Sequence, residues 1–135
     1  MVIKKGGITM NIQSAWLNLP VENLEQSASF FKKIGFTIKK NEAVLDKMRG
    51  IETVDHKIIM LIEQAQFKKV AQLSRLGENE ALVSISVKES KEVDTLLNLV
   101  ETAGGKVLQR GTNHEGFYGG LFSDIDGHLF NVIAM

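Results

Sequence analysis

The sequence has no cysteine, one proline and no net charge. Without cysteine there are no disulfides, no thiolate nucleophiles and no zinc sites built on sulfur. Because 16 Lys and Arg balance 16 Asp and Glu, the chain lacks the basic surface of a general nucleic-acid binder or a polybasic membrane anchor. No apolar run approaches the roughly 20 residues of a membrane-spanning helix. We therefore expect a cytoplasmic protein that has neither nucleic acid nor a membrane as a partner.

The chain has 135 residues, and the 44% of them that are apolar can form a core for one domain. Its first ten residues, MVIKKGGITM, contain a basic pair but no apolar stretch typical of a signal peptide. Lys-Gly-Gly shortly before Met10 is what a purine-rich ribosome-binding site encodes when it is translated. We therefore expect residues 1–10 to be an N-terminal extension, either disordered or a mis-assigned start, and residues 11–135 to be the domain.

A weak internal repeat divides this domain in two. We assign module one to residues 11–66, a linker helix to residues 67–77 and module two to residues 78–135. In each module a strand pattern is followed by an amphipathic helix and three short strand candidates. This order predicts an α+β fold of two βαβββ modules, whereas the rival ferredoxin-like fold has the order β-α-β-β-α-β.

Each module helix has a start signal, a stop signal and one apolar face. Asn23 can cap the first helix and Gly35 can end it in the left-handed conformation. Ser90 is the expected cap of the second helix, and Gly104 ends it. The apolar residues at helical spacing are Leu24, Ala28 and Phe31 in the first helix and Val93, Leu96, Leu97, Val100 and Ala103 in the second.

Alternating apolar residues predict the strands. The first strand of module one is expected at residues 14–21, and that of module two begins at Leu82. The other candidates are residues 36–40, 42–48 and 56–62 in module one and residues 106–110, 118–123 and 128–134 in module two.

Three stretches resemble the vicinal oxygen chelate superfamily, which contains the glyoxalases, the bleomycin-resistance proteins and a group of dioxygenases. NLPVENL at 18–24, followed by an aromatic pair and Gly-Phe, resembles the family's opening strand and helix. FSDIDGH at 122–128 resembles its Phe-x-Asp-Pro-Asp-Gly-His hairpin, with Ile125 in place of proline. HEGFYGG at 114–120 looks like the subgroup described as predicted lactoylglutathione lyases. The resemblance covers residues 11–135 and implies a paired glyoxalase-like domain, a curved mixed sheet around a small-molecule cleft.

The metal site separates the functions of this superfamily. The resemblance implies that its metalloenzymes take His, Gln or Glu ligands from the first and last strands of both modules. The matching positions here are Trp16, Met60, Leu82 and Asn131. Since indole and leucine have no ligand atom, and thioether and amide are poor ligands for a hard cation, we expect no metal and no cofactor. The histidines at 56, 114 and 128 lie in turns without the spacing of another metal site.

Strand alternation predicts which side chains face the cleft, because residues two apart share a face. The expected ligand-binding residues are Trp16, Asn18, Met60, Leu82, Ser84, Asn131, His114, Phe117 and Tyr118. We expect no catalytic residue among them. The loop at 114–120 is interpreted either as a segment that moves over the cleft or as a plain hairpin. The opposite strand faces, with Leu19, Phe130 and Val132 among them, should pack on the helices.

Two functions remain open. One is a metal-free binding protein of the bleomycin-resistance kind, which holds a small, partly apolar molecule in the cleft. The other is a metal-dependent lyase or dioxygenase of the glyoxalase type, whose candidate bases are His114, Glu115 and His128. In either case an exposed sheet edge predicts a homodimer.

Overall fold

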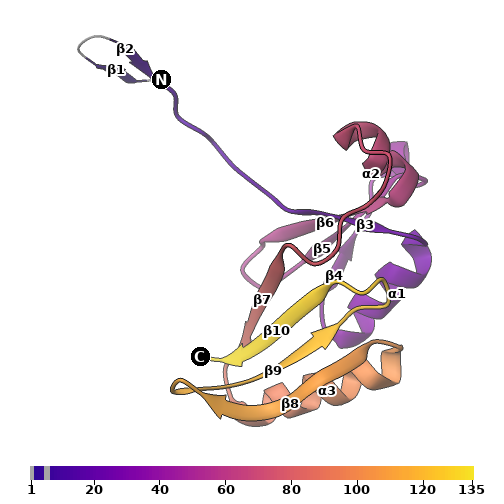
Figure 1. The fold of residues 1–135 in the computed structure, drawn as a ribbon, viewed down its shortest axis with the longest axis vertical. Coiled ribbons are helices and arrows are strands. Elements are labelled where there is room, and N and C mark those ends of the chain that lie inside the picture. The colour runs from indigo at the N-terminus through magenta and orange to yellow at the C-terminus, as the bar shows by residue number, and fades with distance from the viewer. Residues whose placement is uncertain (1, 5–6) are drawn as a thin grey trace.

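The computed structural model describes residues 2–4 and 7–135. The body of the protein is α+β and begins at residue 18 (Figure 1). Module one contains β3 (Asn18–Val21), α1 (Leu24–Ile34), β4 (Thr37–Lys39), the 3-10 turn η1 (Glu42–Val44), β5 (Met48–Glu52) and β6 (Ile58–Glu63). The linker helix is α2 (Gln64–Ala71). Module two contains β7 (Leu82–Val87), α3 (Ser90–Ala103), β8 (Lys106–His114), β9 (Phe117–Ser123) and β10 (Leu129–Ala134).

The strands form two four-stranded mixed sheets of the same topology, β3-β6-β5-β4 and β7-β10-β9-β8. In each sheet the first strand of the module pairs in parallel with the last, and the other pairs are antiparallel. This confirms the α+β fold of two βαβββ modules, with two sheets where the prediction has a single curved one. Asn18 pairs with Met60, and Ser84 pairs with Asn131, so the registers make Met60 and Asn131 equivalent positions.

The N-terminal segment extends away from the body (Figure 1). Its strands β1 (Val2–Lys4) and β2 (Gly7–Thr9) pair with each other in an antiparallel hairpin. Residues 10–17 follow as an exposed segment without helix or strand. The proposal that residues 1–10 are a disordered or mis-assigned start stays a prediction, and residues 1, 5 and 6 lie outside the described residues. Across the part of the chain that the structure describes, no helix is both long and apolar enough to span a membrane.

Helix α1 begins and ends at the predicted residues. The Asn23 Oδ1 accepts a hydrogen bond from the Gln26 N–H at 2.9 Å, which satisfies one of the free amides of the first turn. Gly35, with φ of 121°, ends the helix in a conformation that residues with a β-carbon rarely adopt. The predicted apolar stripe of α1 is buried, and Phe31 is fully so.

Helix α3 has a different cap from the one predicted. The capping residue is Glu89, and Ser90 is the first helical residue, so the assignment of the cap to Ser90 is wrong. Glu89 and Glu92 form a capping box, in which the Glu92 Oε1 accepts the Glu89 N–H at 3.0 Å. A reciprocal pair of this kind satisfies two amides, more than a lone serine would. Gly104 ends the helix as expected.

Module one also differs from the sequence prediction in its strands. The strand expected at residues 42–48 is wrong, because η1 forms there and β5 begins only at Met48. The Asn41 side chain accepts the Ala43 N–H at 3.0 Å, and this local bond favours a turn over a strand. The linker helix, expected at 67–77, lies earlier, at Gln64–Ala71.

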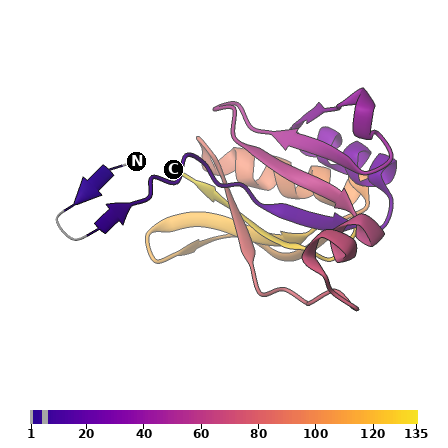
Figure 2. The same ribbon diagram turned by 90° about the horizontal axis from the view of Figure 1, so that it is seen from above.

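Helices α1 and α3 lie side by side in the core, and each packs on the sheet of its own module (Figure 2). Helix α1 contacts β4, β5 and β6, whereas α3 contacts β7 to β10 and also α1. The ring of Phe31 on α1 lies 5.5 Å from that of Phe130 on β10, centroid to centroid. Phe122 stacks on Phe130 at 5.2 Å. The modules therefore share one core, and the predicted helix-facing residues Leu19 and Val132 are buried in it.

A turn of module two also connects the modules at the surface. In this turn, residues 124–128 between β9 and β10, the buried Asp124 accepts the backbone N–H groups of Asp126 and His128. Its second oxygen lies 2.7 Å from the His128 Nδ1. Asp126 in turn accepts the N–H of Glu22, at the end of β3, at 2.9 Å. We call residues 124–128 the clasp turn, since it joins module two to the end of a module-one strand.

Candidate functional site

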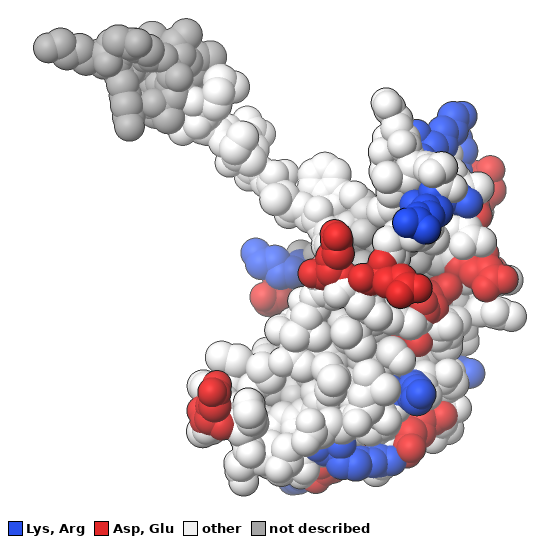
Figure 3. Space-filling view, viewed as in Figure 1, with Lys and Arg blue, Asp and Glu red and all other residues white. Residues whose placement is uncertain are grey.

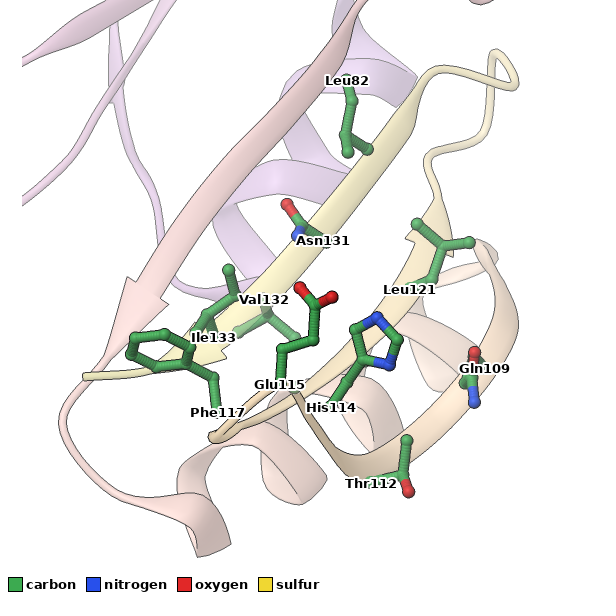
Figure 4. A pocket seen from close by; sticks show the side chains of 12 residues that line it. Leu82, Gln109, Thr112, His114, Glu115, Phe117, Leu121, Asn131, Val132 and Ile133 are labelled. Carbon is green, nitrogen blue, oxygen red and sulfur yellow. The ribbon is translucent and has the colours of Figure 1, made fainter.

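A hollow of about 410 Å³ lies on the face of the second sheet that points away from α3 (Figure 4). We call this the open face. All four strands of module two contribute to the hollow, and so does the tip of the β8–β9 hairpin. The lining residues are Leu82, Gln109, Thr112, His114, Glu115, Phe117, Gly119, Gly120, Leu121, Asn131, Val132 and Ile133. Its volume falls within the range of small-molecule sites, about 300 to 1,000 Å³.

The long β8–β9 hairpin forms the outer wall of this hollow. Strand β8 has nine residues and β9 has seven, whereas β4 of module one has three. The pairing of β8 with β9 shifts register between Val107 and Gln109 and again between Gln109 and Thr112. Such bulges increase the local twist and bend of a strand. We attribute the hollowed surface of module two to this long, bent hairpin.

The tip of this hairpin is a tight turn. His114 pairs with Phe117, and the two residues between them, Glu115 and Gly116, have φ of 51° and 88°. Two successive positive φ angles characterise the type I′ turn that suits a two-residue hairpin. Residues 114–120 therefore form a hairpin in the structure, and the interpretation that they move over the cleft stays a prediction. The hairpin holds His114 and Glu115 with their side chains toward the hollow (Figure 4).

Asn131 supplies a buried acceptor in the floor of the hollow. It lies on the central strand β10, on the open face, between Ser84 of β7 and Leu121 of β9. Its Oδ1 atom is buried and has no hydrogen-bond partner among the described residues. A buried carbonyl without a donor costs about 1 to 3 kcal/mol, so a donor that reached this oxygen would be stabilised there.

The structure brings together four of the nine predicted ligand-binding residues: Leu82, His114, Phe117 and Asn131 all line the hollow. Asn18 instead lines a second hollow, of about 710 Å³, between the modules. Met60 and Ser84 lie on the open faces of their sheets but line neither hollow. Trp16 precedes β3 and is 64% exposed. The ligand-binding role of each of these residues stays a prediction.

Tyr118 is on the other side of its sheet from the hollow. Its hydroxyl donates to the Asp94 Oδ1 of α3 at 2.7 Å, and its ring packs against the core. Gln109 and Thr112, by contrast, line the hollow without having been predicted. Both lie at register shifts of β8, where simple alternation no longer says which way a side chain points.

The residues at the positions of the family's metal ligands do not fit a divalent metal ion. Leu82 and Asn131 line the module-two hollow, whereas Trp16 and Met60 do not, so the four positions do not surround one point within a single chain. Two of the four side chains have no ligand atom. Among the described residues, no group of three His, Asp or Glu side chains is placed to hold a metal.

His128, one of the candidate bases, belongs to the clasp turn and not to the module-two hollow. Burial of the ring lowers its pKa, but the hydrogen bond and charge of Asp124, the charge of Asp126 and the Pro20 carbonyl outweigh this, so the net pKa is raised. Burial has the opposite effect on the Asp126 carboxyl, whose pKa it raises. These groups stabilise the junction of the modules, which leaves His114 and Glu115 as the candidate bases beside the hollow.

No protein-family model and no curated protein matches the chain. Solved structures do. The hypothetical protein SA1046 from S. aureus is 44% identical, with a TM-score of 0.86 over 93% of this chain and 96% of that one. A glyoxalase-related enzyme from Fulvimarina pelagi is 17% identical, with a TM-score of 0.79 over 92% and 89% of the two chains.

A further structure of this fold is a glyoxalase/bleomycin resistance protein/dioxygenase family enzyme from Burkholderia phytofirmans PsJN. It is 17% identical, with a TM-score of 0.75 over 88% of this chain and 95% of that one. The chain belongs to the family of the S. aureus protein, and its fold is that of the glyoxalase/bleomycin-resistance/dioxygenase proteins, the vicinal oxygen chelate superfamily.

Proposed function

We propose that the protein binds a small, partly apolar molecule in the module-two hollow, without a metal, as a binding protein of the bleomycin-resistance kind. The hollow itself carries this proposal. Leucine, isoleucine and phenylalanine side chains provide most of its apolar lining, and a few polar groups, with the Asn131 amide at the centre, can orient a ligand. This combination is typical of small-molecule sites. The face around it is largely uncharged over β7, β10 and β9 (Figure 3).

The alternative, a metal-dependent lyase or dioxygenase of the glyoxalase type, has less support. The positions of the family's ligands carry side chains that do not fit a metal, so no group is available to polarise a carbonyl. The described residues that line the hollow also include no Lys or Arg. The two carboxylates of glutathione would therefore find no cation there.

A binding screen with a blocked variant tests the proposal. Aromatic compounds are titrated by calorimetry into chelator-treated protein, since Trp16 lies outside the hollow and its fluorescence need not report binding there. Leu121→Trp should fill the hollow and abolish binding of any hit. Leu108→Trp is the matched control, because Leu108 lies on β8 but does not line the hollow.

Two results would contradict the proposed function. One is a hit that binds the Leu121→Trp and Leu108→Trp variants equally well while both remain folded. The other is turnover of methylglyoxal and glutathione that appears when Ni²⁺, Zn²⁺, Fe²⁺ or Mn²⁺ is added. The second result would establish the lyase instead.

We also propose that the protein is a homodimer, in which a second copy covers the open sheet faces. Large apolar side chains are exposed there and on the segment before β3, notably Ile12, Trp16, Leu82 and Phe117. An interface between copies would bury them. Light scattering should give twice the mass of one chain, with Trp16→Ser shifting the equilibrium toward single chains. A single-chain mass for the unmodified protein would contradict this. A cytoplasmic location stays a prediction from the sequence.

A further inference from the structure

The charge of the module-two hollow restricts the ligands that it can take. Among the described residues that line it, Glu115 is the one with a formal charge, and none is Lys or Arg. The remaining polar lining residues are Gln109, Thr112, His114 and Asn131. An anionic ligand would therefore lose its hydration without gaining a cationic partner, whereas a cationic ligand would gain Glu115.

The Glu115 carboxylate points toward Asn131 across the hollow (Figure 4). The turn that Glu115 shares with Gly116 places its backbone at the tip of the hairpin. Figure 4 shows its carboxylate directed toward the part of the hollow where Asn131 lies, with the His114 ring beside it. Since the Asn131 Oδ1 is buried and without a partner, a ligand N–H group would satisfy it.

An aromatic surface lies next to these acceptors. Phe117 follows the turn directly and is 52% exposed in the single chain. Together with Leu121 and Ile133 it lines the hollow with flat and branched apolar surface. A planar apolar group can pack there, and the ring face also attracts a nearby cation.

We propose that the hollow selects ligands that carry a protonated amine on a flat apolar body, and that it rejects their carboxylate analogues. Glu115 pairs with the ammonium group, the Asn131 Oδ1 accepts an N–H, and Phe117 and Leu121 hold the flat part. This inference rests on the proposed function, because it names the class of molecule that the same hollow binds.

Three indoles of similar size and different charge test this selection. Tryptamine carries an ammonium group, tryptophol a neutral hydroxyl and indole-3-acetate a carboxylate. Each is titrated by calorimetry at pH 7 and low ionic strength. We expect tryptamine to bind at least ~10-fold more tightly than indole-3-acetate, and this ratio should shrink as salt is added, because exposed charges are screened.

Two variants assign the effect to residues. Glu115→Gln should remove the preference for tryptamine over tryptophol, because the glutamine carries no charge to pair with the ammonium group. Glu42→Gln, which removes an exposed carboxylate of module one, is the matched control and should keep the preference. Asn131→Leu should weaken tryptamine and tryptophol together, since both have a hydrogen to donate and the leucine has no acceptor.

The outcomes separate the two proposals. If none of the three indoles binds, the proposed function fails for flat apolar molecules and this inference fails with it. If all three bind with equal affinity, or if the preference survives Glu115→Gln, the hollow is a ligand site but the inference about charge is overturned.

Discussion

The two modules have the same topology but place residues of very different size at equivalent positions of their sheets. Where module one has the buried Arg49, module two has Gly120, because Arg49 pairs with Leu61 and Gly120 pairs with Val132 at matching places. The Arg49 guanidinium donates to the Met48 carbonyl at 2.9 Å and also pairs with Glu25 of α1. Glycine at the same place allows α3 to approach its sheet closely.

On the open faces of the sheets, module one has the glycine and module two the larger residue. Module one has Gly50 where module two has Leu121, and it has Met60 where module two has Asn131. Its outer hairpin is also short, since β4 ends after three residues. Module one therefore lacks both the wall and the polar centre that module two has. A repeated fold can therefore keep its core in both copies and develop a ligand-sized hollow in one.

The largest expected effect comes from breaking the core that the modules share. Phe130 is fully buried and lies against Phe31 of the other module, so Phe130→Ala should lower the free energy of unfolding by about 3–5 kcal/mol. Because the core is common to both, hydrogen exchange should show both modules losing protection together. The control Phe117→Ala, at a half-exposed position, should cost less than about 1 kcal/mol. Protection lost in module two alone would show that the modules are independent.

A smaller loss of stability is expected from replacing the glycines that differ between the modules. An alanine β-carbon at Gly120 would lie 2.6 Å from the Leu97 Cδ1 and 2.9 Å from the Gln109 carbonyl oxygen. Because a backbone atom cannot move away cheaply, Gly120→Ala should cost about 1–3 kcal/mol in a chemical denaturation experiment. At Gly50 the nearest atoms lie at 3.2 Å and belong to side chains, so Gly50→Ala should cost less. Equal losses would remove this distinction between the modules.

The sequence was sufficient for the features that depend on local signals. The Asn23 cap, Gly35 and the buried stripe of α1 all follow from short-range pattern, and the structure confirms them. Alternation likewise placed Leu19 and Phe130 toward the helices. These features could be predicted because each depends on residues only a few positions apart.

The site was harder to predict because strand alternation says which face of the sheet a side chain lies on, but not whether that part of the face is hollowed. Phe117 and Tyr118 are neighbours in one strand, so they must point to opposite faces, and only Phe117 reaches the hollow. Trp16 has the right periodicity, but in the single chain the ladder of β3 begins only at Asn18. Gln109 escaped prediction because the bulges of β8 interrupt the period of two.

The smallest expected effect is a change in how stability depends on pH, and it concerns the turn between the last two strands of each module. In module two this is the clasp turn, where His128 lies 2.7 Å from Asp124 and 18% of its side chain is exposed. The equivalent turn of module one, residues 53–57, is exposed, and 98% of Val54 is accessible. The two turns have the same length and opposite surroundings, so a change in the turn of module two should affect stability more.

The folded-state pKa of His128 is raised above its ordinary value of 6.5, so the folded protein holds this proton more tightly than the unfolded chain does. Its contribution to stability is therefore complete below about pH 6.5, the ordinary pKa of histidine, and is lost as pH rises through the folded-state pKa. Denaturation midpoints measured from pH 5.5 to 8.5 should fall with pH more steeply for the unmodified protein than for His128→Gln. The control Val54→Gln, in the exposed turn of module one, should keep the slope of the unmodified protein, because it changes no titratable group. If His128→Gln kept that slope as well, the pair of His128 with Asp124 would not contribute to the stability of the protein in this pH range.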